Sequence, residues 1–207
     1  MKHLPNVLTI GRIVVTPIFL VLLLGGTFWG QFVAAILFIL AAISDYWDGR
    51  LARQYKVASR LGQFLDPLAD KVLVLGAFFA FLFLPEDAAG NRLAAPWWWW
   101  AVGLIALRDV AVTALRAWAE RRGQSIQTRY AAKVKTTAQL TFLIATLVFL
   151  VVSKLGRYGN GWIEDLAGLA AQILYGPVTA VLLLVTVVLT LWTGAQYFAP
   201  QKPVATL

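Results

Sequence analysis

The chain has 207 residues, 60% of them hydrophobic, with a mean hydropathy of +0.73. Soluble domains are about 45–50% apolar, so a water-soluble fold is excluded in favour of a single membrane-embedded domain. There is no cysteine, and His3 is the single histidine, which excludes thiolate and histidine metal sites and a histidine base. The net charge of +8 is attributed to membrane topology and anionic headgroups; nucleic-acid binding is not expected, because the basic residues flank apolar segments.

Apolar segments long enough to span a membrane recur about six times along the chain. They fall near residues 13–25, 31–50, 67–84, 97–120, 133–153 and 172–195. The first is short and is expected to be interrupted by Pro17, so it is expected to begin as an interfacial segment. No small-residue cleavage site follows it, so it is interpreted as a retained helix and not as a signal peptide. The predicted fold is all-α, an integral membrane protein in which residues 1–207 form one domain.

Lysine and arginine residues predict the orientation of these helices. Apart from Arg108, which lies within an expected span, all of them fall near one side except Arg92, Lys154 and Arg157. Because cytoplasmic segments carry the excess of Lys and Arg, both termini are expected on the cytoplasmic side. The tryptophans at 97–100 would then anchor the chain at the opposite interface.

Four aspartates lie at the boundary between the second and third apolar segments. Asp45 and Asp48 are spaced i,i+3 at the end of one segment, and Asp66 and Asp70 are spaced i,i+4 at the start of the next. Each spacing places two carboxylates on one helix face, and antiparallel helices would bring all four together. Such carboxylates would repel one another without cations, so two divalent ions are expected, Mg²⁺ or alternatively Mn²⁺. The other interpretation is simple ion pairing with neighbouring Lys and Arg.

The residues around the aspartates favour a phosphate ligand. Gly49 and Gly62 leave the backbone open to close approach, and Ala52 is small. Arg53 can donate two parallel hydrogen bonds to a phosphate. This neighbourhood argues against simple ion pairing.

The full pattern, Asp45-x2-Asp48-Gly49-x2-Ala52-Arg53-x8-Gly62-x3-Asp66-x3-Asp70, resembles the signature of the CDP-alcohol phosphotransferases at every fixed position. The resemblance implies a cytoplasmic-side polar active-site cavity, two metal ions and a homodimer. It implies that Asp45, Asp48, Asp66 and Asp70 ligate metal and that Asp70 is also the general base. The CDP-lipid would be bound by Gly49, Ala52, Arg53, Ser59 and Gly62.

The signature leaves the acceptor alcohol open. Arg108 and Arg116, eight residues apart, lie on nearly one face of the fourth expected helix, and Asp109 is an expected ion-pair partner of Arg108. Lys133 and Lys135 begin the fifth. These four basic residues are expected to bind the phosphate of a phosphorylated acceptor, which free choline or ethanolamine lacks. The alternative for them is positive-inside anchoring.

Three outer segments extend the resemblance over roughly residues 1–150. Residues 6–12, 108–116 and 133–139 are similar to segments of bacterial family members that use glycerol 3-phosphate. The resemblance implies a bacterial inner-membrane enzyme that transfers the phosphatidyl group of CDP-diacylglycerol, a membrane lipid, to glycerol 3-phosphate and releases CMP. Asn6 and Thr9 would line the CDP-lipid site. Inositol phosphate or phosphatidylglycerol as acceptor, and a divalent-cation transporter, are the alternatives.

Overall fold

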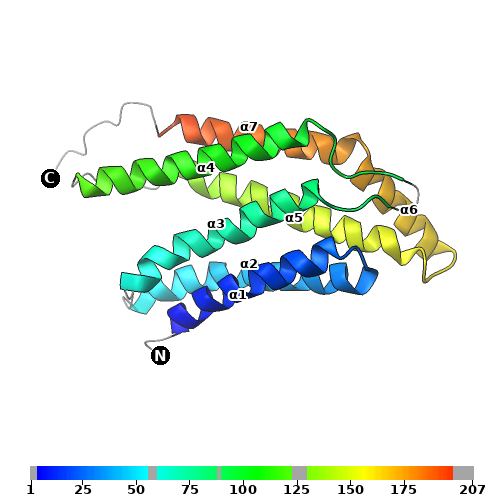
Figure 1. The fold of residues 1–207 in the computed structure, drawn as a ribbon, viewed down its shortest axis with the longest axis horizontal. Helices are drawn as coiled ribbons and strands as arrows, with labels where there is room; N and C mark the ends of the chain where they lie inside the picture. The colour runs from blue at the N-terminus through cyan, green and yellow to red at the C-terminus, as the bar shows by residue number, and fades with distance from the viewer. Residues whose placement is uncertain (1–3, 56–59, 88–89, 123–129, 198–207) are drawn as a thin grey trace.

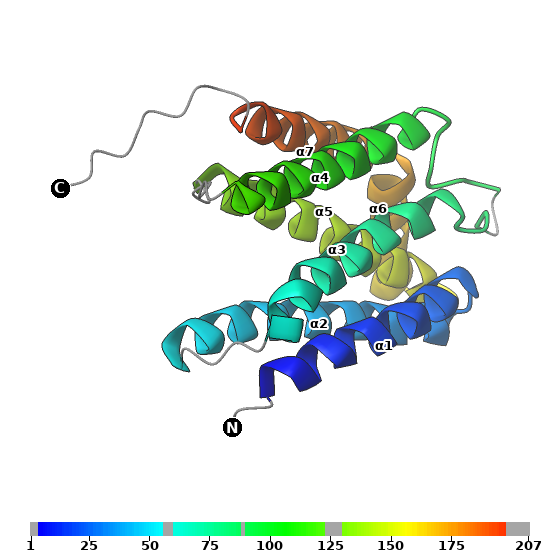
Figure 2. The same ribbon diagram turned by 60° about the vertical axis from the view of Figure 1, so that its left-hand side comes forward.

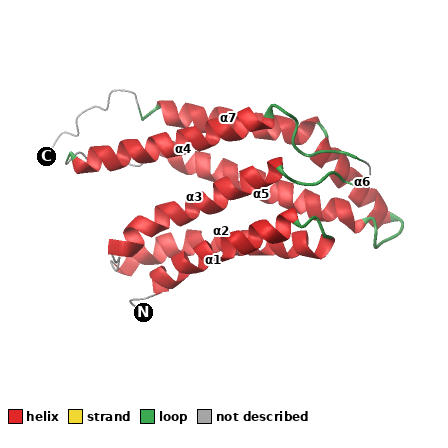
Figure 3. Cartoon of the chain, viewed as in Figure 1, coloured by secondary structure: helices red, strands yellow, loops and turns green. Residues whose placement is uncertain are grey.

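The computed structural model describes residues 4–55, 60–87, 90–122 and 130–197. Side chains are described for residues 11–44, 71–87, 90–119, 121–122 and 133–197. All regular secondary structure in these ranges is helical, which confirms the all-α prediction (Figure 3).

The described residues form seven helices. They are α1 (Leu4–Leu24), α2 (Phe28–Tyr55), α3 (Arg60–Leu82), α4 (Trp98–Arg121), α5 (Tyr130–Leu155), α6 (Trp162–Tyr175) and α7 (Pro177–Ala195). All except α6 run roughly along the long axis of a bundle, and α6 crosses one end of it steeply (Figures 1 and 2). The start of α1, the end of α2, the start of α3 and the end of α7 lie at the other end (Figure 1).

The first helix differs from the prediction, because α1 begins at Leu4 and continues through Pro17. A proline removes one backbone hydrogen bond and usually breaks a helix. Membrane helices tolerate such a loss more often than soluble ones. The carbonyl that Pro17 leaves unpaired is that of Ile13, whereas the Thr16 hydroxyl donates to the carbonyl of Arg12 at 2.7 Å. Since α1 continues past the proline, the expected interruption at Pro17 is wrong.

The last apolar segment also differs, because it is divided between two helices. Gly176 has an extended conformation (φ −91°, ψ −175°), and Pro177 occupies the first turn of α7. A residue that precedes proline avoids the helical region, and proline itself suits the first helical position. The single span expected over 172–195 is thus wrong, and α7 alone provides the apolar helix.

The core of the bundle is built from aromatic and aliphatic side chains of all seven described helices. Phe19 and Phe38 join α1 to α2 with ring centroids 5.4 Å apart. Phe78 of α3 stacks on Phe142 of α5, with centroids 5.7 Å apart. Helix α7 packs against both α4 and α5. This packing fixes α4, α5 and α7 beside one another, which matters for the site.

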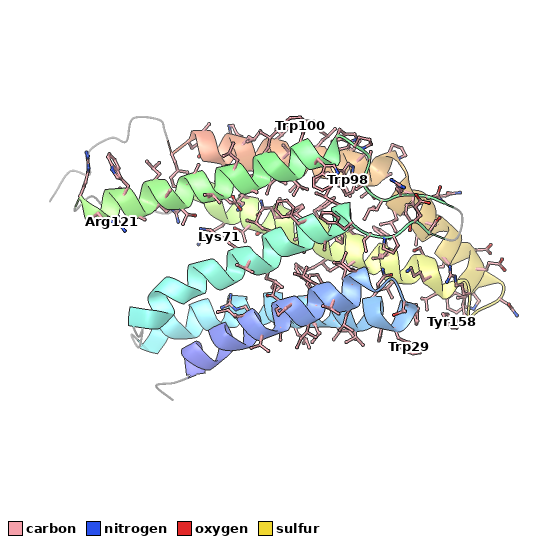
Figure 4. The ribbon with its side chains drawn as sticks, in the orientation of Figure 1. Trp29, Lys71, Trp98, Trp100, Arg121 and Tyr158 are labelled. Atoms are coloured by element: carbon pink, nitrogen blue, oxygen red, sulfur yellow. The ribbon has the colours of Figure 1, made fainter. Side chains whose placement is uncertain are left out.

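The outer surface fits a membrane. In the described residues, three helices are long and apolar enough to cross one, over Trp98–Ala119, Lys133–Leu155 and Pro177–Ala195. Shorter apolar helical stretches are Gly11–Leu24, Phe28–Ser44 and Lys71–Leu82. Exposed Trp29, Trp100 and Tyr158 lie toward one end of the bundle, and Arg121 lies at the other (Figure 4). Aromatic residues at an interface are typical of membrane proteins.

Candidate active site

The four aspartates lie on the helices predicted for them. Asp45 and Asp48 belong to the last part of α2, and Asp66 and Asp70 to the first part of α3. Five peptide units join Tyr55 to Arg60, so those two Cα atoms are at most about 19 Å apart. The backbone therefore brings the aspartate-bearing helix ends together at one end of the bundle (Figure 1).

The remaining residues predicted for the CDP-lipid site lie at this same end or outside the described residues. Gly49, Ala52 and Arg53 continue α2, and Gly62 lies in the first turn of α3. Asn6 and Thr9 lie near the start of α1. The structure describes the backbone of these residues and of the aspartates but not their side chains. Ser59 lies outside the described residues. Their roles stay predictions.

The donor chemistry of this region suits a hard divalent cation. The predicted ligands are four carboxylates, and the chain has no cysteine and one histidine. Oxygen ligands are those that Mg²⁺ and Mn²⁺ prefer. Among the described side chains no group of three or more acids or histidines offers a competing site.

Lys71, the residue directly after Asp70, connects α3 to α4. Its Nζ donates a hydrogen bond to Oγ1 of Thr113, and Lys71 points from α3 towards α4 (Figure 4). The Thr113 hydroxyl in turn donates to the carbonyl of Asp109 at 2.6 Å. From the sequence, Lys71 was an indicator of topology and one of the basic residues that could pair with the aspartates. The structure shows that it also links the aspartate-bearing helix α3 to the helix that carries Arg108 and Arg116.

Asp109 is the centre of a buried ion-pair cluster. Its carboxylate accepts a hydrogen bond of 2.6 Å from Lys135 Nζ and one of 3.1 Å from Arg108 Nη1. The Asp109 side chain is only 3% exposed. The expected pairing with Arg108 is confirmed, and the pairing with Lys135 of α5 is new. Two of the predicted acceptor-binding cations thus share one carboxylate.

Arg108 and Arg116 lie close together, as their spacing predicted. The Cζ atoms of Arg108 and Arg116 lie 5.9 and 4.9 Å from the ring centroid of Tyr197, just beyond α7. The Tyr197 hydroxyl also accepts a hydrogen bond from Arg116 Nη2. On its other side, Arg108 Nη2 donates to Thr193 Oγ1 at 3.1 Å. Sequence reasoning missed Thr193 and Tyr197, because only packing of α7 on α4 reveals them.

We name Arg108, Asp109, Arg116, Lys135 and Tyr197 the basic cluster. Arg108 and Lys135 pair with the Asp109 carboxylate and Arg116 contacts Tyr197, so among the described side chains the basic cluster has three cations and one carboxylate. The Nε atoms of Arg108 and Arg116 are buried and have no hydrogen-bond acceptor in the described part of the chain. Buried donors are normally paired. These two Nε–H groups are unsatisfied donors packed against protein, so the charge of the guanidinium groups, and not the Nε–H groups, would attract an anion.

Lys133 does not join the basic cluster. Its side chain is exposed, whereas Lys135 is buried. Residues two apart on a helix do not share a face, so the two lysines point in different directions from α5. Of the four predicted acceptor-binding residues, the structure brings together Arg108, Arg116 and Lys135.

The cavity beside Arg108 is an apolar groove of about 240 Å³ between α4 and α7. Leu104, Leu107, Val112 and Leu191 line it, and Arg108 is its charged member. It faces the outer surface of these two helices. The predicted polar cavity falls on the aspartate region, whose side chains lie outside the described residues.

Comparison with known proteins agrees with this arrangement. The sequence model of the CDP-alcohol phosphatidyltransferase family matches residues 2–198. The chain belongs to this family and is a membrane-embedded phosphatidyltransferase. The match includes α7, which extends the resemblance beyond the 1–150 range that the motifs had covered.

Among the relatives are two enterobacterial enzymes named CDP-diacylglycerol–glycerol-3-phosphate 3-phosphatidyltransferase. That of Escherichia coli (strain K12) is 34% identical over 202 residues, which cover 97% of this chain and 95% of the relative. The enzyme of Salmonella typhimurium (strain LT2) is 35% identical over 202 residues, again 97% of this chain and 95% of the relative. Family membership argues against the transporter alternative.

Proposed function

We propose that this protein transfers the phosphatidyl group of CDP-diacylglycerol to glycerol 3-phosphate, giving phosphatidylglycerophosphate and CMP. Relatives at 34–35% identity bear the name of this activity. The observation that supports glycerol 3-phosphate as the acceptor is the basic cluster on α4, the helix that Lys71, the residue after Asp70, contacts through Thr113. A phosphorylated acceptor bound there would have its hydroxyl end free to reach the aspartates.

In this proposal all four aspartates bind metal, and Asp70 also transfers a proton. Asp45, Asp48, Asp66 and Asp70 would hold two divalent cations, most suitably Mg²⁺. When bound, these ions offset the negative charge of the diphosphate and of the departing CMP. Asp70 takes the proton from the acceptor hydroxyl. The hydroxyl oxygen then forms a bond to the β-phosphorus of CDP-diacylglycerol, and the bond from that phosphorus to the CMP oxygen breaks.

The basic cluster positions the acceptor for this attack. The guanidinium groups of Arg108 and Arg116 supply charged donors for the phosphate, and their positive charge attracts a dianion. Lys135 contributes charge while Asp109 holds it in place. Correct orientation of two reactants is worth a large part of a reaction barrier. The hydrogen bond from Lys71, the residue after Asp70, to Thr113 of α4 supports the placement of the basic cluster near Asp70.

The membrane arrangement follows the same proposal. We place the CDP-lipid headgroup against Asn6, Thr9, Gly49, Ala52, Arg53, Ser59 and Gly62. The bilayer would hold its acyl chains. The start of α1 and the end of α7 share one end of the bundle, in agreement with both termini on the cytoplasmic side of a bacterial inner membrane (Figure 1). Six membrane-crossing segments, a cytoplasmic-side cavity and a homodimer complete the proposed arrangement.

An acceptor panel tests the proposed function. Purified protein is supplied with CDP-diacylglycerol, Mg²⁺ and one acceptor at a time, namely glycerol 3-phosphate, inositol phosphate or phosphatidylglycerol. We expect CMP release and lipid product with glycerol 3-phosphate, against a control without acceptor. Product from inositol phosphate or phosphatidylglycerol, with none from glycerol 3-phosphate, would overturn the proposal.

A matched pair of arginine variants tests the site. Arg116→Met removes a half-buried member of the basic cluster, whereas Arg122→Met removes an exposed arginine that lies over Trp118 with Cζ 3.9 Å from its ring. Hydrogen bonds to charged groups are worth about 1.5–3 kcal/mol, so Arg116→Met should raise the KM for glycerol 3-phosphate by roughly 10–100-fold. Arg122→Met should leave that KM within about twofold, because changes to exposed charges have small effects. Equal effects of the two would place the acceptor phosphate elsewhere.

A further inference from the structure

Tyr197, just beyond the end of α7, contacts both arginines of the basic cluster on the neighbouring helix α4. It follows directly after α7, and only 5% of its surface is exposed. Both guanidinium groups lie within the range of a cation–π contact, about 6 Å from the ring centroid. Its hydroxyl accepts a hydrogen bond from Arg116 Nη2. One side chain therefore restrains two residues that are eight positions apart on α4.

The chemistry of this contact differs from that of Asp109. A carboxylate orients a cation but also cancels its charge, as Asp109 does for Lys135. An aromatic ring orients a cation through its quadrupole and remains neutral. Tyr197 can thus hold Arg108 and Arg116 close together while the positive charge needed to attract a phosphate is retained.

The end of α7 is shaped around Arg108 as well. Thr193 accepts a hydrogen bond from Arg108 Nη2. At Gly194, an added Cβ would lie 2.8 Å from Cγ and 2.9 Å from Nε of Arg108, closer than side chains tolerate. Close approach of the α7 backbone is therefore a condition for the observed position of Arg108. This end of α7 closes the side of the basic cluster that lies opposite Asp109.

We infer that Tyr197 is a positioning residue, which orients the guanidinium groups of Arg108 and Arg116 towards the phosphate of the acceptor. This inference rests on the proposed function, because it concerns the phosphate of glycerol 3-phosphate. It assigns a task to the C-terminal end of α7, to which the sequence motifs assigned none.

Two substitutions of different severity test the inference. Tyr197→Phe keeps the ring and removes the hydroxyl, which should raise the KM for glycerol 3-phosphate about fivefold, the equivalent of one hydrogen bond. Tyr197→Leu also removes the cation–π contacts, which should raise the total to about 25-fold. The KM for CDP-diacylglycerol and the kcat should stay within about twofold, because Tyr197 does not touch the reacting atoms. A purely structural role would lower kcat and change both KM values together.

Matched controls come from Tyr158, which is 64% exposed at the opposite end of the bundle. Tyr158→Phe and Tyr158→Leu make the same chemical changes, and both should match the wild type. If the Tyr197 variants behave like the Tyr158 variants, the inference is overturned. It is also overturned if Tyr197→Phe is as impaired as Tyr197→Leu, because the ring would then contribute nothing.

A binding measurement separates this inference from the proposed function. Inorganic phosphate should raise the thermal unfolding temperature of the wild-type protein, since it binds the folded state. Tyr197→Leu should need roughly 25-fold more phosphate for the same rise. A wild-type protein that fails to use glycerol 3-phosphate would refute the function alone. Phosphate stabilisation that is identical in wild type and Tyr197→Leu would refute the role of Tyr197 alone.

Discussion

The substitution Asp109→Asn tests whether the basic cluster is also a structural element. Asparagine has nearly the shape of aspartate, so packing is retained and only the negative charge is lost. The Asp109 carboxylate faces Lys135 Nζ at 2.6 Å and Arg108 Nη1 at 3.1 Å, and its side chain is 3% exposed. Without that charge, two buried cations would face each other with no anion between them.

The expected cost follows from this burial. Removal of one partner of a buried ion pair typically destabilises a protein by about 3–5 kcal/mol. Asparagine still offers a carbonyl oxygen to one donor, so we expect about 3 kcal/mol for Asp109→Asn. The variant Lys135→Met removes one of the stranded cations. In the double variant Asp109→Asn/Lys135→Met, the loss should therefore be smaller than the sum of the single losses by about 2 kcal/mol.

The assay is reversible unfolding in mixed micelles as the fraction of sodium dodecyl sulfate increases, for wild type, both single variants and the double variant. Asp165→Asn serves as the control, because Asp165 is an exposed acid in the first turn of α6. That control should cost less than about 1 kcal/mol, the usual value of a charge at a helix end. Additive losses in the cycle, or equal losses for Asp109→Asn and Asp165→Asn, would refute the assigned ion pairs.

Three further predictions concern the chemistry of the site and its geometry. Asp70→Asn should abolish CMP release while CDP-diacylglycerol binding, measured by titration calorimetry, persists; near-normal turnover would show that Asp70 is not the base. Chelation with EDTA should abolish activity, and Mg²⁺ or Mn²⁺ should restore it; full activity in EDTA would contradict an oxygen-ligated metal site. Gly168→Ala, where an added Cβ meets nothing within 4 Å, should stabilise α6 by up to about 1 kcal/mol. Gly194→Ala should lack this gain and raise the KM for glycerol 3-phosphate, because Arg108 must move; equal behaviour of the two alanines would contradict the close packing at Gly194.

Two errors in the predicted fold arise from local signals that were given the wrong weight. Pro17 was expected to interrupt the first helix, but α1 continues through it. Gly176 and Pro177 divide the last apolar segment, although hydrophobicity runs across them without a change. Hydropathy measures the preference for lipid, and it does not measure backbone conformation. The fate of each proline depends on whether neighbouring groups satisfy the freed backbone atoms.

The candidate site shows a similar division. Asp45, Asp48, Asp66 and Asp70 could be found from the sequence, because helical spacing alone puts each pair on one face. The grouping of Arg108 with Arg116 could be found for the same reason. Tyr197 could not be found from the sequence, because it is 81 residues away from Arg116 and only the packing of α7 on α4 brings the two together.

The sequence by itself determined the membrane environment, the helical class, the aspartate signature and the family, since all of these depend on composition or on spacing within one helix. The tertiary structure decided which basic residues act together. It brought Lys135 to Asp109, left Lys133 exposed, joined Lys71 to Thr113 and closed the cluster with Tyr197. Charges attract over several ångströms in every direction, so the positions of lysines and arginines in the sequence do not identify partners that lie on other helices. Those partners are set by how α3, α4, α5 and α7 pack.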